Sequence, residues 1–594
     1  MKDFIKYVFA TVVGIILFLL IAGILGAMSL AGMVASSSAT TSLDDGTVMV
    51  LNLNGSLEER HEDDFMSQFT GQLSTGLGLE DMLKAIKKAK DDDHIKGIYI
   101  EAGSFSSDAP ASLQVLRKAL LDFKKSGKWI VAYGDQYYQG AYYVASVADQ
   151  IWMNPSGMLD WHGLAAEPMF YKDLMEKFGV KMQLSKVGTY KSAPETYTAD
   201  HMSEPNREQV TVYINGVWQN MVAEVSASRK ISAEKLNEYA DSLITFADPQ
   251  DYVKMKMVDK LIYTDQVKEE VKKLLKLEED DDIPQVSVAG MQHVKDTSEK
   301  GDDQIAIYYA YGDIVDKPEQ GILMGGGHQI IGNDVAKDLL KLAEDDDVKA
   351  VVFRVNSGGG SAYASEQMWR AVTLLKKKKP VVVSMGGLAA SGGYYISCAA
   401  NWIVAEPTTL TGSIGIFGMF PDFSGLLTQK LGVKFDEVKT NRNAGFGTMS
   451  RPFNAEEMEY LNRYIGRGYQ LFLKRVADGR KSTPEAIDKV AQGRVWLGQD
   501  AIKNKLVDQL GSLDDAVAKA AQLAKLESYY TSSYPAKADW MDQLMNSSSK
   551  AGGNYLDAQL HEALGNYYEP FMLIRNISKQ NPVQARMPFS LNLR

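Results

Sequence analysis

The sequence predicts an α/β protein made of two tandem copies of one unit behind a single N-terminal membrane-spanning segment. Three observations support this fold class. The chain has 594 residues, which is too long for one hydrophobic core. Apolar strand patterns alternate with helical stretches in both halves. The segment "LAASGGYYISCAAN" of the second half also has an echo, "YYQGAYYVASVADQ", in the first half.

The N-terminal segment contains no charged residue from Tyr7 to Val34. At about 1.5 Å per residue, a helix of this length exceeds the roughly 30 Å of a hydrocarbon core. A cleaved signal peptide has an apolar region of only about 7–15 residues, which favours an uncleaved anchor. Because Lys2 and Lys6 precede the apolar run, the N-terminus should stay in the cytoplasm. We therefore expect residues 1–40 to form a cytoplasmic stub and a single-pass anchor.

The first unit is predicted at residues 41–276. An apolar strand pattern at Ile98–Ile100 precedes a helical stretch at Ala111–Lys124. A second apolar run at Trp129–Ala132 leads into a glycine-containing turn and another helix. The order strand, helix, strand, helix is typical of a parallel α/β sheet.

The second unit is predicted at residues 301–530 and repeats this order, with apolar strands at Val351–Val355 and Val381–Val383. The acidic run and the proline of "LEEDDDDIPQ" predict a solvated linker at 277–300, between the two units. The C-terminal extension at 531–594 has no counterpart in the first half, and the sequence predicts no role for it.

Composition excludes several classes of function. The chain is globular, with 45% apolar and 23% charged residues, and its net charge of -11 argues against a nucleic-acid partner. The single cysteine, Cys398, lies in an apolar stretch and is predicted to be a buried thiol. No HExxH segment or phosphate-binding loop occurs, so we expect neither a metal nor a cofactor.

Ser391 lies where the strand "PVVVSM" ends in a glycine-rich turn and the helix "GGYYISCAA" begins. A side chain there projects at the carboxyl edge of the sheet beside unpaired helix amides, which suits an oxygen nucleophile. The echo carries Gln139 at this position. A glycine triplet in "RVNSGGGSA" (354–362) follows a buried strand and lets backbone amides approach a ligand. Each segment alone is also consistent with a structural turn or a flexible loop.

A nucleophilic serine needs a base that removes its proton. The seven histidines are scattered and none lies in a recognisable triad segment, although a Ser-His-Asp site assembled by folding stays open. The alternative base is a lysine kept neutral by burial. The segment "SKVGTYKSAPETYT" (185–198) offers Lys186 and Lys191, and Lys191 has small and aromatic neighbours that would enclose it.

Four motifs, "GTYKSAPE", "RVNSGGGS", "AASGGYYIS" and "TGSIGIFG", resemble those of the long, membrane-bound form of bacterial signal peptide peptidase A, and they occur in that family's order. The resemblance covers roughly residues 1–530. It implies tandem Clp-protease/crotonase-like domains and a serine endopeptidase that uses a Ser/Lys dyad.

The resemblance also implies a role for each matching residue. The nucleophile matches Ser391 and the general base matches Lys191. The oxyanion amides match Gly359 and Gly392, and the serine that orients the lysine matches Ser413. The chain departs from the family pattern at Gly358, where the family commonly has proline.

The implied setting is the bacterial inner membrane, with a cytoplasmic N-terminus and an extracytoplasmic catalytic region. Family members assemble as membrane-tethered homotetramers with hydrophobic clefts for remnant signal peptides and other apolar peptides. After duplication the second unit would have kept the serine and the first unit the lysine, which leaves Gln139 as the relic of a lost nucleophile. Two alternatives stay open: an inactive scaffold of the same fold, and an acyl-CoA enzyme of the crotonase type.

Overall fold

The computed structural model describes residues 6–7, 14, 17–18, 42–61, 76–295, 301–318, 328–537 and 582–587. The predicted membrane span at 7–34 lies almost entirely outside these residues. Within the described part of the chain, no helix has both the length and the apolar character needed to cross a bilayer.

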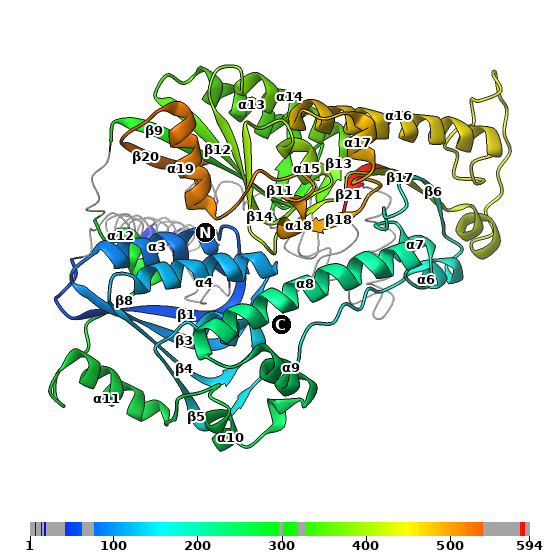
Figure 1. Cartoon of the computed structure of the whole chain (residues 1–594). Helices are drawn as coiled ribbons and strands as arrows, with labels where there is room; N and C mark the ends of the chain where they lie inside the picture. The colour runs from blue at the N-terminus through cyan, green and yellow to red at the C-terminus, as the bar shows by residue number, and fades with distance from the viewer. Residues whose placement is uncertain are drawn as a thin grey trace.

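The first unit is built on a parallel sheet in the order β2-β1-β3-β4-β5-β7, with β8 also beside β1 (Figure 1). Its strands are β1 (Thr47–Glu58), β2 (Gly76–Gly78), β3 (Ile95–Ser107), β4 (Trp129–Tyr137), β5 (Gln150–Leu159), β7 (Lys260–Leu261) and β8 (Gln285–Ser287). Its helices are α3 (Leu79–Asp91), α4 (Pro110–Lys124), α5 (Gln139–Ala145), α6 (Lys172–Lys177), α7 (Glu195–Thr198), α8 (Glu204–Arg229), α9 (Ala233–Asp241), α10 (Pro249–Lys254), α11 (Thr264–Leu275) and α12 (Val288–His293), with a 3₁₀ turn at Ile244–Phe246.

The second unit repeats this plan in the order β18-β16-β14-β12-β9-β20, with β15 beside β14 and β19 beside β15. All of its pairings are parallel except β16 with β18. Its strands are β9 (Asp303–Tyr311), β12 (Val348–Ser357), β14 (Val381–Ala390), β15 (Trp402–Ala405), β16 (Leu410–Gly412), β18 (Val495–Leu497), β19 (Gln509–Leu510) and β20 (Tyr529–Tyr534). Its helices are α13 (Gly332–Glu344), α14 (Ala362–Leu375), α15 (Gly392–Ser397), α16 (Ala455–Arg480), α17 (Pro484–Asp488), α18 (Gly498–Ala501) and α19 (Leu513–Ala524), with a π-helical turn at Leu426–Lys430.

Helices cover both faces of each large sheet. In the first unit α3, α4, α5 and α8 share the main hydrophobic core, and α11 packs on the opposite face. In the second unit α13 to α16 share one core, and α19 covers the other face. This doubly covered parallel architecture explains why the central strands are continuously apolar in sequence.

Matching contacts in the two units confirm the predicted duplication. Tyr142 in α5 and Tyr394 in α15 each donate a hydrogen bond from the hydroxyl to a backbone carbonyl, at 3.0 and 2.9 Å. Arg229 and Arg480 end the long helices α8 and α16, and each pairs with an aspartate, at 2.8 and 2.6 Å. The two copies therefore share side-chain contacts as well as element order.

A third, six-stranded sheet has the order β11-β10-β13-β21-β17-β6. Its strands are β6 (Lys181–Val187), β10 (Asp313–Val315), β11 (Gln329–Ile331), β13 (Gly359–Ser361), β17 (Ile416–Asp422) and β21 (Val583–Arg586). Strand β6 comes from the first unit and pairs with β17 of the second, while β21 comes from the C-terminal extension. This sheet joins segments that are far apart in sequence.

The segment predicted as a linker, 277–300, includes ordered structure after its acidic run. Strand β8 pairs with β1, and Met291 in α12 is fully buried. The ammonium of Lys88 donates to the carbonyl of Met291 at 3.1 Å. Packing of the first unit therefore continues beyond the acidic residues.

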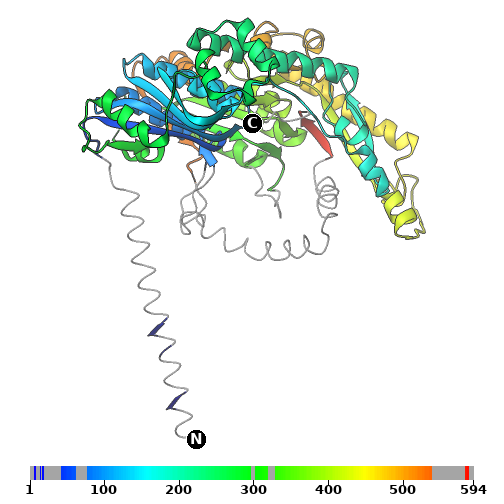
Figure 2. The ribbon, with the colours of Figure 1, turned by 90° about the horizontal axis from the view of Figure 1, so that it is seen from below.

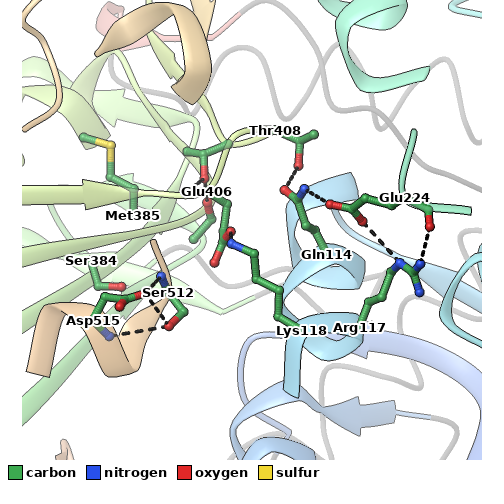
Figure 3. A network of polar contacts seen from close by, with 12 residues as sticks. Gln114, Arg117, Lys118, Glu224, Ser384, Met385, Glu406, Thr408, Ser512 and Asp515 are labelled. Atoms are coloured by element: carbon green, nitrogen blue, oxygen red, sulfur yellow. Dashed lines mark hydrogen bonds and ion pairs between the residues drawn. The ribbon is translucent and has the colours of Figure 1, made fainter. Parts of the chain in front are cut away.

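Polar contacts also join the two units directly (Figure 3). Lys118 in α4 forms an ion pair with the buried Glu406, which follows β15. The side chain of Gln114 accepts a hydrogen bond from Thr408 at 2.8 Å and donates one to Glu224 in α8 at 2.6 Å. Two side chains of helix α4, Lys118 and Gln114, therefore bind residues of the second unit.

Candidate active site

Ser391 follows β14 and forms the N-cap of α15, in the predicted strand, turn and helix. Its backbone has φ 54° and ψ -112°, a conformation that residues other than glycine rarely adopt. The strained turn is held by a 2.8 Å hydrogen bond from its N–H to the carbonyl of Gly412. The residue is completely buried.

Lys191 reaches this serine from a loop of the first unit that follows β6. Its Nζ lies 2.7 Å from Oγ of Ser391. The same nitrogen donates to the carbonyl oxygen of Ser413 at 3.0 Å and lies 3.1 Å from its Oγ. The three side chains that were predicted from separate motifs are thus brought together, and each of the two units contributes to the cluster.

The lysine amine is held in a dry environment. Lys191 is fully buried, and burial alone lowers its pKa well below the usual value. An uncharged amine has two N–H donors and one lone pair. The carbonyl and hydroxyl oxygens of Ser413 can accept both donors, which leaves the lone pair directed at the hydroxyl of Ser391.

Two glycines of the second unit form a slot for the lysine. A β-carbon at Gly493, where φ is +78°, would lie 2.5 Å from the backbone nitrogen of Lys191 and 2.6 Å from its Cα. A β-carbon at Gly415 would lie 3.1 Å from the lysine Cδ. All three distances are shorter than ordinary contacts between heavy atoms, so a larger residue at either glycine would displace the lysine.

Gln209 in α8 fastens the lysine loop to the second unit. Its side-chain nitrogen donates to the carbonyl of Tyr190 at 3.1 Å and to Oγ of Ser192 at 2.8 Å. Its side-chain oxygen accepts from the N–H of Val495 in β18 at 3.2 Å. Gln209 is buried, so these bonds form where water does not compete. Gln209 and Gly493 lie in none of the motifs singled out above, and Gly415 lies in "TGSIGIFG" without an assigned role, because the roles of all three residues depend on contacts between distant segments.

The two predicted oxyanion residues lie side by side. A β-carbon at Gly359, where φ is +102°, would lie 2.7 Å from the backbone nitrogen of Gly392. The N–H of Gly359 donates to Oγ of Ser357 at 3.1 Å in this structure. An oxyanion bound by Gly359 would therefore replace the Ser357 hydroxyl as the acceptor.

Gln139, the counterpart of Ser391 in the first unit, fixes a loop. Its side-chain oxygen accepts from the N–H groups of His162 and Gly163, both at 3.0 Å. Its side-chain nitrogen donates to the carbonyl of Gly163, also at 3.0 Å. Glutamine thus has a structural role where the second unit has a serine.

The other candidate residues lie elsewhere. Lys186 points toward Glu195, with a 3.9 Å separation between Nζ and the carboxylate. His94 and His162 pair with aspartates at the surface, at 2.9 and 2.8 Å. Cys398 is buried, as predicted.

Comparison with known proteins places this chain in a family. The model described as "Peptidase family S49" matches residues 122–278 and 373–527, once in each unit, and the model described as "Clp protease" matches residues 313–405. "Protease 4" of Salmonella typhi is 40% identical over 476 residues, which cover 79% of this chain and 76% of that protein.

Two further relatives match over a similar length. "Protease 4" of Haemophilus influenzae is 35% identical over 507 residues, covering 82% of this chain and 80% of that protein. "Serine protease SPPA, chloroplastic" of Arabidopsis thaliana is 32% identical over 488 residues, covering 81% and 70%.

Proposed function

Because this chain belongs to peptidase family S49 and is a serine protease, we propose that it cleaves peptide bonds with Ser391 as the nucleophile and Lys191 as the general base. The observation that carries the proposal is the 2.7 Å contact between Nζ of Lys191 and Oγ of Ser391 in a fully buried cluster. A hydroxyl and a neutral amine at this distance are within reach for direct proton transfer.

The proposed reaction proceeds in two stages. The Ser391 proton moves to Lys191 while Oγ attacks the substrate carbonyl carbon. The amides of Gly359 and Gly392 receive the negative charge that develops on the carbonyl oxygen. The ammonium of Lys191 then returns the proton to the leaving amine, which breaks the peptide bond and leaves an ester on Ser391. Water hydrolyses the ester with Lys191 again as the base.

Ser413 positions the base in this scheme. Its carbonyl and hydroxyl oxygens accept from two N–H groups of the amine, so the lone pair of the neutral amine is directed at Ser391 before the proton is transferred. A neutral hydroxyl does this without restoring the lysine charge, as a carboxylate would.

We extend the proposal to the substrates and the setting. The substrates are remnant signal peptides and other apolar peptides, which are cleaved by a homotetramer anchored in the bacterial inner membrane with its catalytic region outside the cytoplasm. The uncharged run from Tyr7 to Val34 supports the anchor. The "Putative signal peptide peptidase SppA" of Enterococcus faecium supports the substrate class, with 32% identity over 189 residues that cover 32% of this chain and 55% of that protein.

The proposal is tested by comparing Ser391→Ala with Gln139→Ala in the full chain. Ser391→Ala should lower kcat/KM on an apolar peptide by at least about 10³-fold and abolish labelling by a fluorophosphonate, because it removes the nucleophilic oxygen. Gln139→Ala should cost about 1–3 kcal/mol of stability, since it leaves loop amides unpaired, but keep the activity of the folded protein. A wild-type chain that is folded yet neither labelled nor active would favour the inactive scaffold.

A further inference from the structure

Strand β14 contains a bulge shortly before the nucleophile. In the pairing of β12 with β14, Val355 lies opposite Met385. Two residues further along β12, Ser357 lies opposite Ala389, which is four residues further along β14. The additional residues of β14 therefore fall within 386–388. Because a bulge bends its strand and changes the local twist, its shape sets where the turn that carries the nucleophile begins.

Side chains of β12 hold both ends of this bulge. A bulge leaves backbone groups that the neighbouring strand does not pair. The guanidinium of Arg354 donates to the carbonyl of Met385 at 3.1 Å, where the bulge begins. The side-chain oxygen of Asn356 accepts from the N–H of Leu388 at 3.0 Å, where the bulge ends. Both side chains are buried, so water does not compete for these bonds.

Two carboxylates of the first unit fix these side chains in turn. Glu59, directly after β1, accepts from Nε of Arg354 at 2.6 Å and from the side-chain nitrogen of Asn356 at 3.2 Å. Asp108, shortly before α4, accepts from the same nitrogen of Asn356 at 2.9 Å. In Figure 2 the dark-blue strand β1 runs toward the green segments of the second unit. We refer to Glu59, Asp108, Arg354 and Asn356 as the junction cluster.

The bulge also packs directly against the first unit. A β-carbon at Gly387 would lie 2.2 Å from Cβ of Ala109, the residue after Asp108. A β-carbon at Gly386 would lie 2.8 Å from Cβ of Asn356. Such close approach requires glycine at both positions. A displacement of the first unit at this point would therefore move the bulge.

Strand β12 leads from the junction cluster into the proposed oxyanion segment. The carbonyl of Asn356 accepts from the N–H of Gly312 at 3.0 Å. The hydroxyl of the next residue, Ser357, donates to the carbonyl of Gly312 at 2.6 Å and accepts from the N–H of Gly359 at 3.1 Å. Asn356 therefore lies between the bulge that precedes the nucleophile and the segment that carries an oxyanion amide.

The first unit has different residues at the matching positions. Counted from the start of each strand, Glu101 and Gly103 of β3 take the positions of Arg354 and Asn356 of β12. Glu101 is exposed and has the opposite charge, and Gly103 has no side chain. The pairing of β3 with β4 continues in register as far as Ala102. The polar pair on β12 thus accompanies the nucleophile in the second unit.

We infer that Glu59 and Asp108 of the first unit are positioning residues for catalysis: through the side chains of β12 they hold the bulge of β14 and fix the place of Ser391. Misplacement of a reacting group by about 1 Å costs on the order of 10²-fold in rate, so a cluster outside the Ser/Lys contact can control catalysis. The effect on catalysis rests on the proposed function. The first unit then supplies the geometry of the nucleophile as well as the base.

The first test reverses the direction of one hydrogen bond. Asn356→Asp keeps an oxygen for the N–H of Leu388, but it removes the donor to Asp108 and adds a third carboxylate beside Glu59. The double variant Asn356→Asp/Asp108→Asn restores a donor and an acceptor in the opposite direction and returns the cluster to its original charge. Asp108→Asn alone keeps an oxygen that can accept from Asn356, so it should lower kcat by about five-fold at most.

The single variant Asn356→Asp should lower kcat on an apolar peptide by about 10²-fold, with KM changed by less than about three-fold. This split is expected because the oxyanion amides act on charge that develops only in the transition state. The double variant should recover about ten-fold or more of the loss. The rate constant of fluorophosphonate labelling should follow the same order. The fraction of molecules labelled reports separately on folding.

Thr408→Val is the matched control. It removes another buried hydrogen bond between the units, from Thr408 to Gln114 at 2.8 Å, which involves neither β12 nor the bulge. Thr408→Val should lower the temperature of thermal unfolding but leave kcat unchanged. Thermal unfolding of every variant shows that the protein is folded at the temperature of the assay.

The second test measures the position of the turn without catalysis. Hydrogen exchange is followed by mass spectrometry in peptides that contain residues 386–391. Exchange in these peptides should be faster in Asn356→Asp than in wild type and should slow again in the double variant, whereas Thr408→Val should match wild type. If exchange follows this order but wild type is neither labelled nor active, the proposed function is refuted and the link between the first unit and the turn stands.

Three results would overturn the inference. One is a folded Asn356→Asp variant with the kcat and labelling rate constant of an active wild type. Another is a double variant as slow as Asn356→Asp, because the loss would then not come from the bond to Asp108. The third is an equal loss of kcat in Thr408→Val, because any weakening of the contact between the units would then be sufficient.

Discussion

Folding moves the Lys191 amine from water into a fully buried site. Burial lowers its pKa well below the value of a free lysine, near 10.4. Its closest polar neighbours are the oxygens of Ser391 and Ser413, which do not compensate a positive charge as a carboxylate would. The environment that suits a general base therefore destabilises the folded protein at neutral pH.

Lys191→Met should therefore raise the free energy of unfolding at pH 7 while abolishing activity. The unfolded chain binds more protons than the folded chain between the lowered folded pKa and about 10.4, so stability in this window rises with pH. The gain of the methionine variant should shrink as the pH approaches 10.4. Chemical denaturation of both proteins at pH 7 and pH 10 measures this difference in the free energy of unfolding.

Lys186→Met is the matched control for this prediction. Lys186 lies in the same segment but is exposed; its Nζ faces Glu195 and donates to the carbonyl of Lys191 at 3.4 Å. Its replacement should bring no gain at pH 7. If both variants changed stability equally, the buried charge of Lys191 would not be the cause.

At the scale of single elements, the sequence was most informative about the serine. A buried strand, a glycine-rich turn and a helix follow one another within a few residues, so local pattern was enough to place Ser391 at the strand end. The lysine loop gave no such pattern. The position of this loop depends on Gln209, Gly415 and Gly493. Residue types alone offered Lys191 as a candidate beside Lys186, and the resemblance to a known family assigned Lys191 the role of base.

Gly493→Ala should lower kcat/KM by about 10²-fold or more. The new β-carbon would overlap the backbone of Lys191 and move Nζ away from Ser391, and misplacement by about 1 Å is enough for such a loss. Gly127→Ala is the matched control, because Gly127 has φ +81° with open space around its Cα. Each variant should cost about 1–2 kcal/mol of stability for its left-handed backbone. Equal activities in the two variants would show that Gly493 does not set the position of Lys191.

The C-terminal extension was the element that the sequence explained least. Strand β21 is short and has partners on β13 and β17, which are distant in sequence. Nothing in its four residues distinguishes it from a loop, because a short strand is stabilised by its neighbours rather than by its own pattern.

At the scale of the whole molecule, the two units form one interlocked structure. A buried ion pair joins Glu59 of the first unit to Arg354 of the second at 2.6 Å. The side chain of Asn356 donates to Asp108 at 2.9 Å. Burial, with Glu59 nearby, raises the pKa of Asp108 to about 6. Duplication was visible in the sequence, but this junction was not, since its charged residues are scattered along the chain.

Asp108 should make the protein less stable as the pH rises from about 4 to about 6. Its folded pKa is raised, so its contribution is fully present below the unfolded pKa near 3.8 and is lost through pH 6. The loss should be about 3 kcal/mol for a shift of about 2 units. Asp108→Asn should flatten this part of the stability profile, whereas Asp346→Asn, at an exposed position, should leave it unchanged. If the free energy of unfolding changed equally with pH in wild type and in Asp108→Asn, another group would be responsible for the change.

The shared Ser/Lys site is the central claim, and the pH dependence of Ser391 labelling tests it most directly. The measurement is the rate of fluorophosphonate labelling from pH 5 to pH 10 in wild type and in Lys191→Met. Wild type should follow one ionisation well below 10.4, and the methionine variant should be at least about 10²-fold slower with no such step. A methionine variant that keeps the wild-type rate and profile would contradict the claim and return the search for the base to the histidines.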